Sequence, residues 1–298
     1  MPVHDDLGVR MKTFYEQIPK TKLMRRCPVA IRIDGKAFHT FTRGFQKPFD
    51  EVLIKSMQET MKYLCENIQG CVLGYAQSDE ITLILVDYKK LTSSAWFDYE
   101  VQKMCSIAAS MATIAFNKFF IENVEWAYNE EYQSLGLNSK SNFDSIEEYD
   151  KVFDQLEKKY EPYYKKEGTA MFDARCFNIP KEEVTNLIYW RQLGAIRNSI
   201  QMVGQANFSQ KELQNKSCKD ILEMLSEQKN IAWDNLPVYL QRGSCCIKMY
   251  QIDEQGTVQS HSEDKLIPNG HTHWLVCKDV PLFKDAGREY IDKLIMVG

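Results

Sequence analysis

Two aspartates stand at the edges of apolar, β-branched runs, and their chemistry depends on whether the fold brings them together. Asp34 ends the run at residues 29–33 and is followed by Gly35, whereas Asp79 comes just before the run at residues 81–85. If these runs form neighbouring strands, the two carboxylates face each other and repel unless a cation lies between them. A divalent metal is the usual cation in nucleotidyl transfer. The pattern therefore predicts metal-dependent chemistry on nucleotides.

Strands and helices alternate around these aspartates. The first strand is followed by a helix that begins near Asp50 and runs to about residue 67, with an apolar face that includes Met57 and Leu64. The second strand follows Gly70, and residues 81–86 continue as its hairpin partner. A long helix rich in small side chains is expected over residues 97–120. The resulting β-α-β-β-α order predicts an α+β fold.

The remaining elements are predicted more coarsely. A short helix is expected over residues 5–20, before the first strand, and no internal repeat is visible. After the middle of the chain the pattern predicts a strand at 170–179, helices at 182–205 and 219–228, and strands between 243 and 280 broken by turns at 253–256 and 268–270.

Length and composition limit the class of protein. The 298 residues suffice for one large domain or two ordinary ones, and no run approaches the roughly 20 apolar residues of a membrane span. No signal or organellar presequence is recognisable, so a soluble, cytoplasmic protein without a membrane partner is expected. Nine cysteines without a C-x-x-C pair favour reduced thiols over disulfides or zinc.

The net charge of −4 argues by itself against a nucleic-acid partner, but the charge is unevenly distributed. Residues 121–168 carry twelve acidic and six basic side chains, which leaves the rest of the chain at +2. Within this segment, Ser145 and Glu148 form a capping-box pattern ahead of an apolar stripe with helical spacing. Residues 135–168 are therefore predicted to be an acidic insertion with an amphipathic helix, which packs on its own domain or contacts another subunit.

Several motifs together resemble one known family, that of tRNA-His guanylyltransferase and its relatives, the 3′-5′ RNA polymerases. The resemblance covers most of the chain outside the insertion. It rests on the segments 32–39 (RIDGKAFH), 47–50 (KPFD), 75–80 (YAQSDE), 96–97 (WF) with Lys103, 172–175 (FDAR) and 190–192 (WRQ) with Asn198.

The resemblance implies a polymerase-palm-like antiparallel sheet flanked by helices. The palm would span residues 1–134, the insertion 135–168, and a family-specific C-terminal α/β region residues 169–298, packed on the palm. Asp34 and Asp79 are the implied catalytic residues and the ligands of two Mg²⁺ ions, with the Gly35 carbonyl as a further ligand. Glu80 either supports these ligands or is an ordinary strand residue.

Nucleotide binding is expected around the same turn. The backbone N–H groups of Lys36, Ala37 and Phe38 leave the strand in a turn and are candidates to hold phosphate oxygens. His39 contacts the nucleotide or makes a structural hydrogen bond, and the two alternatives stay open. The Ser78 hydroxyl can donate to a phosphate, and the resemblance adds three further nucleotide-binding residues: Lys47, Asp50 and Lys103.

One position departs from the family pattern. In eukaryotic tRNA-His guanylyltransferases a histidine follows the Trp-Arg-Gln motif, and here Ile196 takes its place. An isoleucine side chain makes no hydrogen bond, which puts recognition tied to histidine tRNA in doubt. The sequence is more similar to the bacterial-type and protist relatives, for which the resemblance implies ATP-dependent activation and template-directed 3′-5′ nucleotide addition that repairs 5′-truncated tRNA.

The implied partners are tRNA, ATP and other nucleoside triphosphates, and further copies of the chain in a homotetramer. Five arginines are candidates to face RNA: Arg25, Arg26, Arg175, Arg191 and Arg197. Three alternative functions are addition of a single guanosine at position −1 of tRNA-His, nucleotide cyclisation, and RNA binding without catalysis. The cyclase has no need of the 190–192 region, and the intact Asp34, Asp79 and Lys103 speak against a non-catalytic relative.

Overall fold

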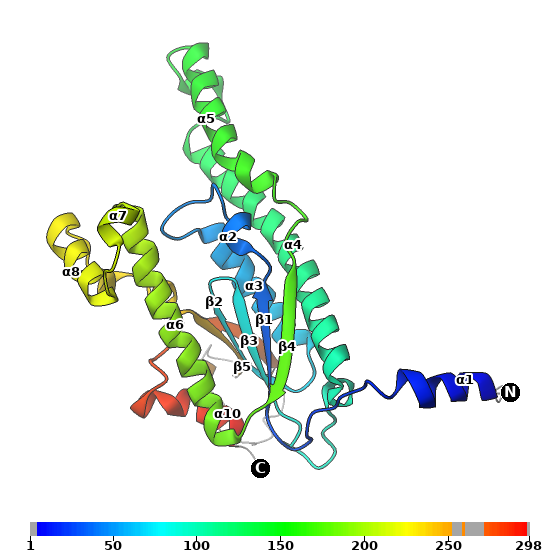
Figure 1. Cartoon of the computed structure of the whole chain (residues 1–298). Helices are drawn as coiled ribbons and strands as arrows, with labels where there is room; N and C mark the ends of the chain where they lie inside the picture. Colours follow the sequence, from blue (N-terminus) through cyan, green and yellow to red (C-terminus); the bar gives the residue numbers. More distant parts are fainter. Residues whose placement is uncertain (1–4, 252–257, 260–270, 297–298) are drawn as a thin grey trace.

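The computed structural model describes residues 5–251, 258–259 and 271–296 (Figure 1). Residues before the insertion form helix α1 with a π-helical turn, the β-α-β-β unit and a long helix. Their bounds are α1 Asp6–Met11, the π turn Lys12–Glu16, β1 Val29–Gly35, α2 Phe38–Phe41, α3 Glu51–Asn67, β2 Cys71–Gln77, β3 Glu80–Leu85 and α4 Val101–Ser134.

The second half alternates helices with further strands. Its bounds are α5 Ile146–Tyr164, β4 Phe172–Asn178, α6 Lys181–Asn207, α7 Gln210–Leu213, α8 Cys218–Lys229, α9 Val238–Arg242, β5 Ser244–Gln251, β6 Val258–Gln259, β7 His271–Cys277 and α10 Glu289–Ile295. The turns expected at 253–256 and 268–270 lie outside the described residues. The predicted β-α-β-β-α order is confirmed.

One antiparallel sheet organises the molecule, with strand order β4-β1-β3-β2-β5-β6 and β7 paired with β5. Strands β4, β5 and β7 belong to residues 169–298, the predicted C-terminal region. They extend the same sheet at both edges, because β4 pairs with β1 and β5 with β2, while α6 and α10 of this region pack on one face of it.

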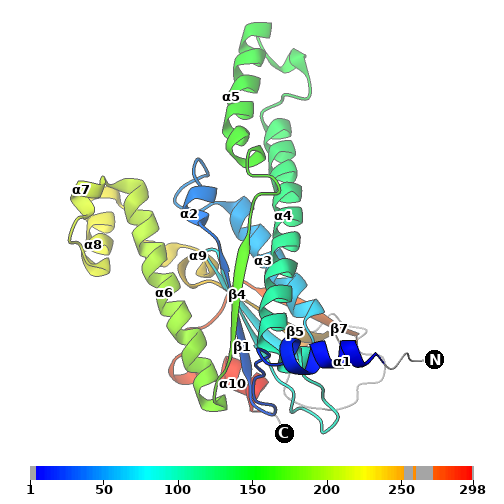
Figure 2. The same ribbon diagram turned by 45° about the vertical axis from the view of Figure 1, so that its right-hand side comes forward.

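Alternate side chains of the sheet enter two separate cores. Ile31 and Ile33 of β1 pack with α3 and α4 on one face, whereas Ala30 packs with α6 and α10 on the other. Figure 2 shows α4 and α6 on opposite sides of β1 and β4. Residues of β1 with even numbers, including Asp34, therefore belong to the face that α6 covers.

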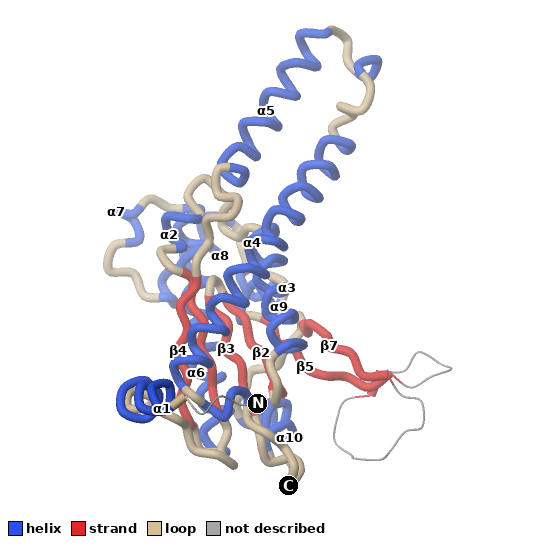
Figure 3. The backbone as a smooth tube through the Cα atoms, turned by 90° about the vertical axis from the view of Figure 1, so that its right-hand side faces the viewer, coloured by secondary structure: helices blue, strands red, loops and turns tan. Residues whose placement is uncertain are grey.

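Helix α4 differs from its expected bounds at both ends. It begins at Val101, because Phe97, Asp98 and Tyr99 have positive φ angles that interrupt a helix. It continues to Ser134, where α5 turns back along it, and Figure 3 shows the two helices side by side as an arm projecting from the sheet. Leu156, Tyr160 and Tyr163 of α5 are buried. The predicted amphipathic helix is confirmed.

Helix α5 packs on its own chain through part of its apolar stripe, and contact with another subunit stays a prediction. The Tyr163 ring stacks on Phe45 at 4.2 Å, and Tyr160 donates a hydrogen bond of 2.9 Å to Glu131 of α4. The apolar stripe is therefore used within the chain, although Ile146 at its start is exposed.

The composition of α4 also bears on the membrane question. It is the single helix, among the residues described, whose length and apolar character would allow it to cross a membrane. A core helix passes the same test, and α4 buries Met104, Ala108 and Phe116 against the sheet. All nine cysteines are free thiols in the structure, as expected.

Candidate active site

The turn between β2 and β3 brings Asp79 next to the end of β1. Ser78 adopts a left-handed conformation with φ of 50°, which makes the tight connection between the two strands. The Gly35 N–H then donates a hydrogen bond of 3.0 Å to the Asp79 carbonyl. The predicted neighbourhood of the two aspartates is therefore present, with Asp34 in β1 and Asp79 in the adjoining turn.

Three carboxylates form a row across the sheet. Asp34 pairs in register with Glu80 on one side and with Asp173 on the other, so all three side chains share one face. Such a row is strongly repulsive unless its charges are balanced. Its outer members are each paired with arginine.

Glu80 is almost fully buried and binds two guanidinium groups. Its Oε1 accepts from Arg191 Nε at 2.6 Å, and its Oε2 accepts from Arg191 at 2.7 Å and from Arg32 at 2.8 Å. At the other end, Arg175 donates to Asp173 at 2.9 Å. Glu80 therefore lies in a buried ion pair that joins β3 to α6, rather than serving as an ordinary strand residue.

Asp34 in the middle of the row has no such partner. Within the described part of the chain it makes no salt bridge and no side-chain hydrogen bond. Burial raises its pKa, and the charges of Asp79, Glu80 and Asp173 raise it further. Burial also raises the pKa of Asp79, opposed by the hydrogen bond from Ser78 Oγ at 2.9 Å. The two aspartates thus hold uncompensated negative charge at one point of an otherwise balanced face.

The donor set suits a hard divalent cation. Two carboxylates of raised pKa, with the backbone of Gly35 beside them, offer the oxygen ligands that Mg²⁺ prefers. No group of three or more His, Cys, Asp or Glu side chains within the described ranges is arranged around a common metal position. The residues fit a metal that keeps several water or phosphate ligands, as Mg²⁺ commonly does.

The turn after β1 supplies fewer free N–H groups than the sequence suggested. Lys36 N–H already donates to the Met171 carbonyl at 2.8 Å, so this amide is engaged within the chain, and nucleotide binding by Lys36 stays a prediction. Ala37 is the N-cap residue of α2 and has a left-handed φ of 55°. The amides of Ala37 and Phe38 have no acceptor among the described residues. They remain candidates to bind an anion at the aspartates.

Gly35 is required by its surroundings. A Cβ atom built there would lie 2.3 Å from the Phe38 ring, which is itself packed in the core. A larger residue would therefore displace Phe38 and the turn that follows. His39 is exposed on this turn, and it makes a small contribution that lowers the pKa of Asp79.

Asp50 has a structural role in this chain. Its Oδ1 accepts the Leu53 N–H at 2.8 Å as the N-cap of α3, and its Oδ2 accepts the Gln46 N–H and the Tyr163 hydroxyl. Lys47 is exposed beside it. A nucleotide contact of Asp50 stays a prediction, and its carboxylate is already engaged by three donors.

Lys103 lies away from the two aspartates within one chain. It is on the first turn of α4, and α4 covers the sheet face opposite to α6, whereas Asp34 is on the α6 face. Near this turn the Val101 carbonyl accepts from Cys176, which pairs with Ile31, three residues before Asp34. The Lys103 ammonium sits 4.9 Å from the centre of the Phe97 ring. Its binding to triphosphate remains a prediction.

The candidate RNA-facing arginines fall into two groups. Arg25 binds the buried carboxylate of Asp87 at 2.6 Å, and Arg26 donates to three backbone carbonyls near it, so both hold the segment before β1. Arg191 is bound to Glu80. Arg175 and Arg197 are exposed, and Arg197 forms no salt bridge within the described residues. Contact of these arginines with RNA is untested.

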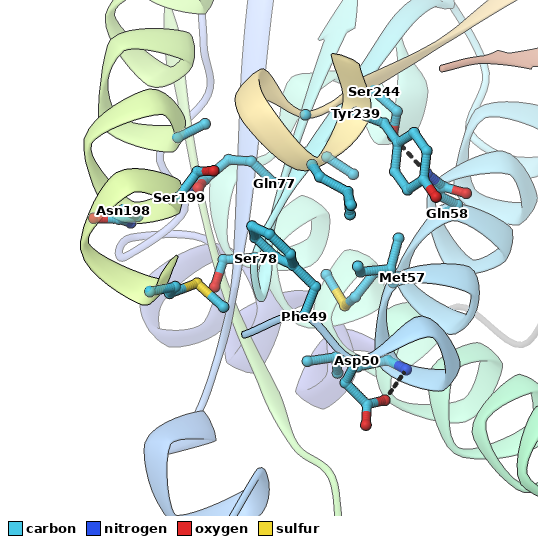
Figure 4. A pocket seen from close by; sticks show the side chains of 17 residues that line it. Phe49, Asp50, Met57, Gln58, Gln77, Ser78, Asn198, Ser199, Tyr239 and Ser244 are labelled. Atoms are coloured by element: carbon cyan, nitrogen blue, oxygen red, sulfur yellow. Dashed lines mark hydrogen bonds between the residues drawn. The ribbon is translucent and has the colours of Figure 1, made fainter. Parts of the chain in front are cut away.

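A pocket opens beside the aspartates, between α3, α6 and α9 (Figure 4). Its cavity volume is about 100 Å³, and it is open to solvent on one side, so it has room for a part of a ligand such as one ring. Phe49, Met57 and Leu240 contribute apolar surface, and Ser78 lies at the end next to Asp79. The expected residues Asp50 and Ser78 both line it.

Sequence reasoning missed several polar residues of this pocket, among them Gln58, Gln77, Ser199, Tyr239 and Ser244. Gln77 precedes the Ser-Asp-Glu motif and could have been included on that ground. The others come from α3, α6 and the C-terminal part, and only the fold brings them together. Ile196, the departure from the family pattern, packs against the small core of α6 and α8.

Comparisons with known proteins identify the family of the chain. A family model described as tRNAHis guanylyltransferase matches residues 8–180. A bacterial tRNA(His) guanylyltransferase (Thg1)-like protein solved in complex with ATP is 36% identical, with a TM-score of 0.72 over 97% of this chain and 99% of that chain. A structure of such a bacterial protein in complex with GTP is 34% identical, with a TM-score of 0.69 over 98% and 99%.

Among curated proteins, the tRNA(His) guanylyltransferase of Saccharomyces cerevisiae is 23% identical over 244 residues, which cover 77% of this chain and 86% of the yeast protein. The family match spans more than half of the chain, and the bacterial-type structures match nearly all of it. The chain therefore belongs to the tRNA(His) guanylyltransferase family and is a nucleotidyltransferase.

Proposed function

We propose that this enzyme repairs the 5′ end of truncated tRNA, or of another structured RNA, by template-directed 3′-5′ nucleotide addition. The observation that carries the proposal is the pair Asp34 and Asp79, left unbalanced beside a pocket while Glu80 and Asp173 are neutralised. ATP and GTP complexes of the bacterial-type relatives support a nucleoside triphosphate as the occupant of this region.

The reaction would proceed in two transfers. In the first, the 5′-monophosphate of the RNA attacks the α-phosphorus of ATP, which forms an adenylylated 5′ end and releases pyrophosphate. In the second, the 3′-hydroxyl of an incoming nucleoside triphosphate attacks the RNA 5′ phosphorus, and AMP leaves. The new 5′ end carries the triphosphate of the added nucleotide.

The chain's own residues would hold the reactants for these transfers. Asp34, Asp79 and the Gly35 carbonyl would bind Mg²⁺, which supplies charge neutralisation of phosphates and a lowered pKa of an attacking hydroxyl. The amides of Ala37 and Phe38 would bind phosphate oxygens, and the pocket beyond Ser78 would hold a base. The exposed Arg175 and Arg197 would contact the RNA backbone.

Template-directed addition is favoured over single-guanosine addition by Ile196. This side chain is partly buried against the core of α6 and α8 and has no hydrogen-bonding group. Base pairing with the opposite RNA strand would then select the nucleotide, so that the protein needs only shape and backbone contacts. We also propose a homotetramer, on the family resemblance alone, and the cytoplasmic location expected from the sequence stays a prediction.

An assay of nucleotide addition to the RNA 5′ end tests the proposal. The enzyme is incubated with MgCl₂, ATP, labelled nucleotides and a tRNA that lacks its first 5′ nucleotide, in parallel with intact monophosphorylated tRNA-His. Extension of the truncated tRNA according to its template is expected. Guanosine addition to tRNA-His alone would favour the second candidate, and a cyclic nucleotide or RNA binding without extension would contradict the proposal.

Two variants locate the activity. Asp79→Ala is expected to abolish extension while the protein stays folded, because it removes one of the two metal-binding carboxylates. Asp154→Ala is the matched control, since Asp154 is an exposed aspartate on α5 in the arm. Undiminished extension by Asp79→Ala would contradict the assignment of Asp79 as a metal ligand.

A further inference from the structure

The end of the pocket away from the aspartates contains a polar pair that the proposed function does not yet use. Gln58 of α3 and Ser244 of β5 both line the pocket and are both nearly buried, at 6% and 2% exposure. Gln58 Nε2 donates to Ser244 Oγ at 3.3 Å, as Figure 4 shows. This is a long hydrogen bond, and it is the one hydrogen bond that the Gln58 side chain makes within the described structure.

The hydrogen-bonding capacity of Gln58 is only partly used. A carboxamide offers two N–H donors and a carbonyl acceptor, and the bond to Ser244 occupies one donor. For the Gln58 carbonyl oxygen and the second N–H, no partner exists within residues 5–251, 258–259 and 271–296. A polar group in a mostly apolar pocket gains from a ligand that completes its hydrogen bonds.

The position of Gln58 suits the base of a nucleotide. It lies two helical turns beyond Asp50, roughly 12 Å along α3, and away from Ser78 at the phosphate end. Between these ends, Phe49, Met57 and Leu240 offer apolar surface for the flat faces of a ring. A nucleotide with its phosphates at the aspartates would direct its base toward Gln58.

Ser244 allows the amide to serve two different bases. A hydroxyl accepts a hydrogen bond from the carboxamide N–H or donates one to its carbonyl oxygen, so Gln58 keeps this anchor in either of its flipped orientations. One orientation presents the carbonyl to a base and the other presents the N–H group. Adenine and guanine carry opposite groups at position 6, an amino donor and a carbonyl acceptor respectively.

We propose that Gln58, anchored by Ser244, reads the polar edge of a purine base and, by flipping its amide, accepts ATP and GTP alike. The proposal rests on the proposed function, because it takes a nucleoside triphosphate to be the ligand of the pocket. Gln58 is then a residue that determines base specificity rather than a group that acts on the reacting phosphates.

Calorimetric titration of the full chain with ATP, GTP and inorganic tripolyphosphate, each with Mg²⁺, tests this. Gln58→Met keeps the length of the side chain but removes its hydrogen bonds, and is expected to weaken ATP and GTP about 2- to 10-fold, the worth of one neutral hydrogen bond. The affinity for tripolyphosphate, which has no base, is expected to stay the same. Ser244→Ala is expected to give a smaller loss of the same kind.

A matched control and a selectivity variant sharpen the test. Gln69→Met removes a comparable bond, from Gln69 Nε2 to Ser94 Oγ at 2.6 Å, outside the pocket, and should change no affinity. Gln58→Glu presents only acceptors when ionised and is expected to shift the GTP/ATP affinity ratio toward ATP, because the 6-amino group of adenine is a donor whereas guanine carries a carbonyl acceptor at this position.

The outcomes distinguish a failure of the proposed role of Gln58 from a failure of the proposed function. If Gln58→Met is folded and binds ATP and GTP as tightly as the wild type does, the proposed role of Gln58 is overturned and the proposed function still stands. A loss shared equally by tripolyphosphate would also overturn it, since it would indicate general damage to the site. Wild-type protein that binds neither nucleotide while folded would refute the nucleotide pocket and the proposed function with it.

Discussion

Replacing Glu80 with glutamine tests the charge balance of the site directly. The carboxylate accepts three charge-assisted hydrogen bonds, two from Arg191 and one from Arg32, at 2.6–2.8 Å. Glutamine with its carbonyl oxygen at the Oε2 position keeps two of these bonds and loses the third, because its amide N–H₂ then faces the Arg191 Nε–H. The lost bond is worth about 1.5–3 kcal/mol, and two buried guanidinium groups also lose their counter-charge, so a total near the ~3–5 kcal/mol typical of breaking a buried ion pair is expected.

Urea denaturation measures this loss of unfolding free energy. With a slope near 3 kcal/mol per molar, Glu80→Gln should lower the midpoint by about 1 M or more. Trp190 reports on the transition by fluorescence, because the Arg191 guanidinium lies 4.6 Å from its ring centre.

The same carboxylate-to-amide change at Asp173 is the control. Asp173 and Arg175 are exposed, with 61% and 52% of their side chains accessible, so Asp173→Asn should cost less than about 1 kcal/mol. If Glu80→Gln destabilised the protein no more than Asp173→Asn, the buried ion pair would not hold β3 to α6 and the reasoning would be refuted.

Three further changes test other parts of the structure. Asp34→Asn should raise the stability of the metal-free protein at pH 7, because burial and the neighbouring carboxylates raise the pKa of Asp34 in the folded state and so disfavour its charged form. The gain should shrink as the pH falls through that raised pKa, because the native state then binds the proton. Equal urea midpoints of the variant and the wild type at pH 7 would contradict this prediction. Tyr163→Phe removes the hydroxyl shared by Asp50 and the Gln46 N–H and should cost about 1–3 kcal/mol in urea unfolding, whereas Tyr164→Phe on the same helix should change it by less than about 0.5 kcal/mol. Gln192→Leu leaves the Pro281 carbonyl and the Phe283 N–H without their side-chain partner and should lower the unfolding free energy by about 2–5 kcal/mol; a loss below 1 kcal/mol would show that these groups find other partners.

The elements near the aspartates could be predicted because their signals are local. β-branched runs, the cap at Asp50 and the periodicity of the insertion each depend on residues close in sequence. The end of α4 was missed because its last turns are stabilised by α5, a contact between residues some 30 apart such as Lys159 with Glu131. Its start was missed because residues 97–99 adopt left-handed angles that their types do not indicate.

The candidate site divides in the same way. The proximity of Asp34 and Asp79 follows from a hairpin and one strand pairing, which sequence can suggest. The pairing of Glu80 with Arg191 depends on where α6 crosses the sheet, more than 100 residues later in the chain. The same holds for the meeting of Gln58 with Ser244, since no sequence pattern specifies contacts at that separation.

Helix α6 is tied to two different elements by consecutive residues, and this fixes its rotation about its own axis. Arg191 binds Glu80 of the sheet, and Gln192 binds the segment at residues 281–283 on another side. The pocket wall follows from this orientation, because its residues recur at helical spacing after these anchors: Ala195, Asn198, Ser199 and Met202. One residue inserted between 192 and 195 would turn this stripe by about 100° and face it away from the pocket. Insertions or deletions between residues 192 and 195 would therefore disrupt the pocket wall, whereas the loop between α4 and α5 can accommodate them.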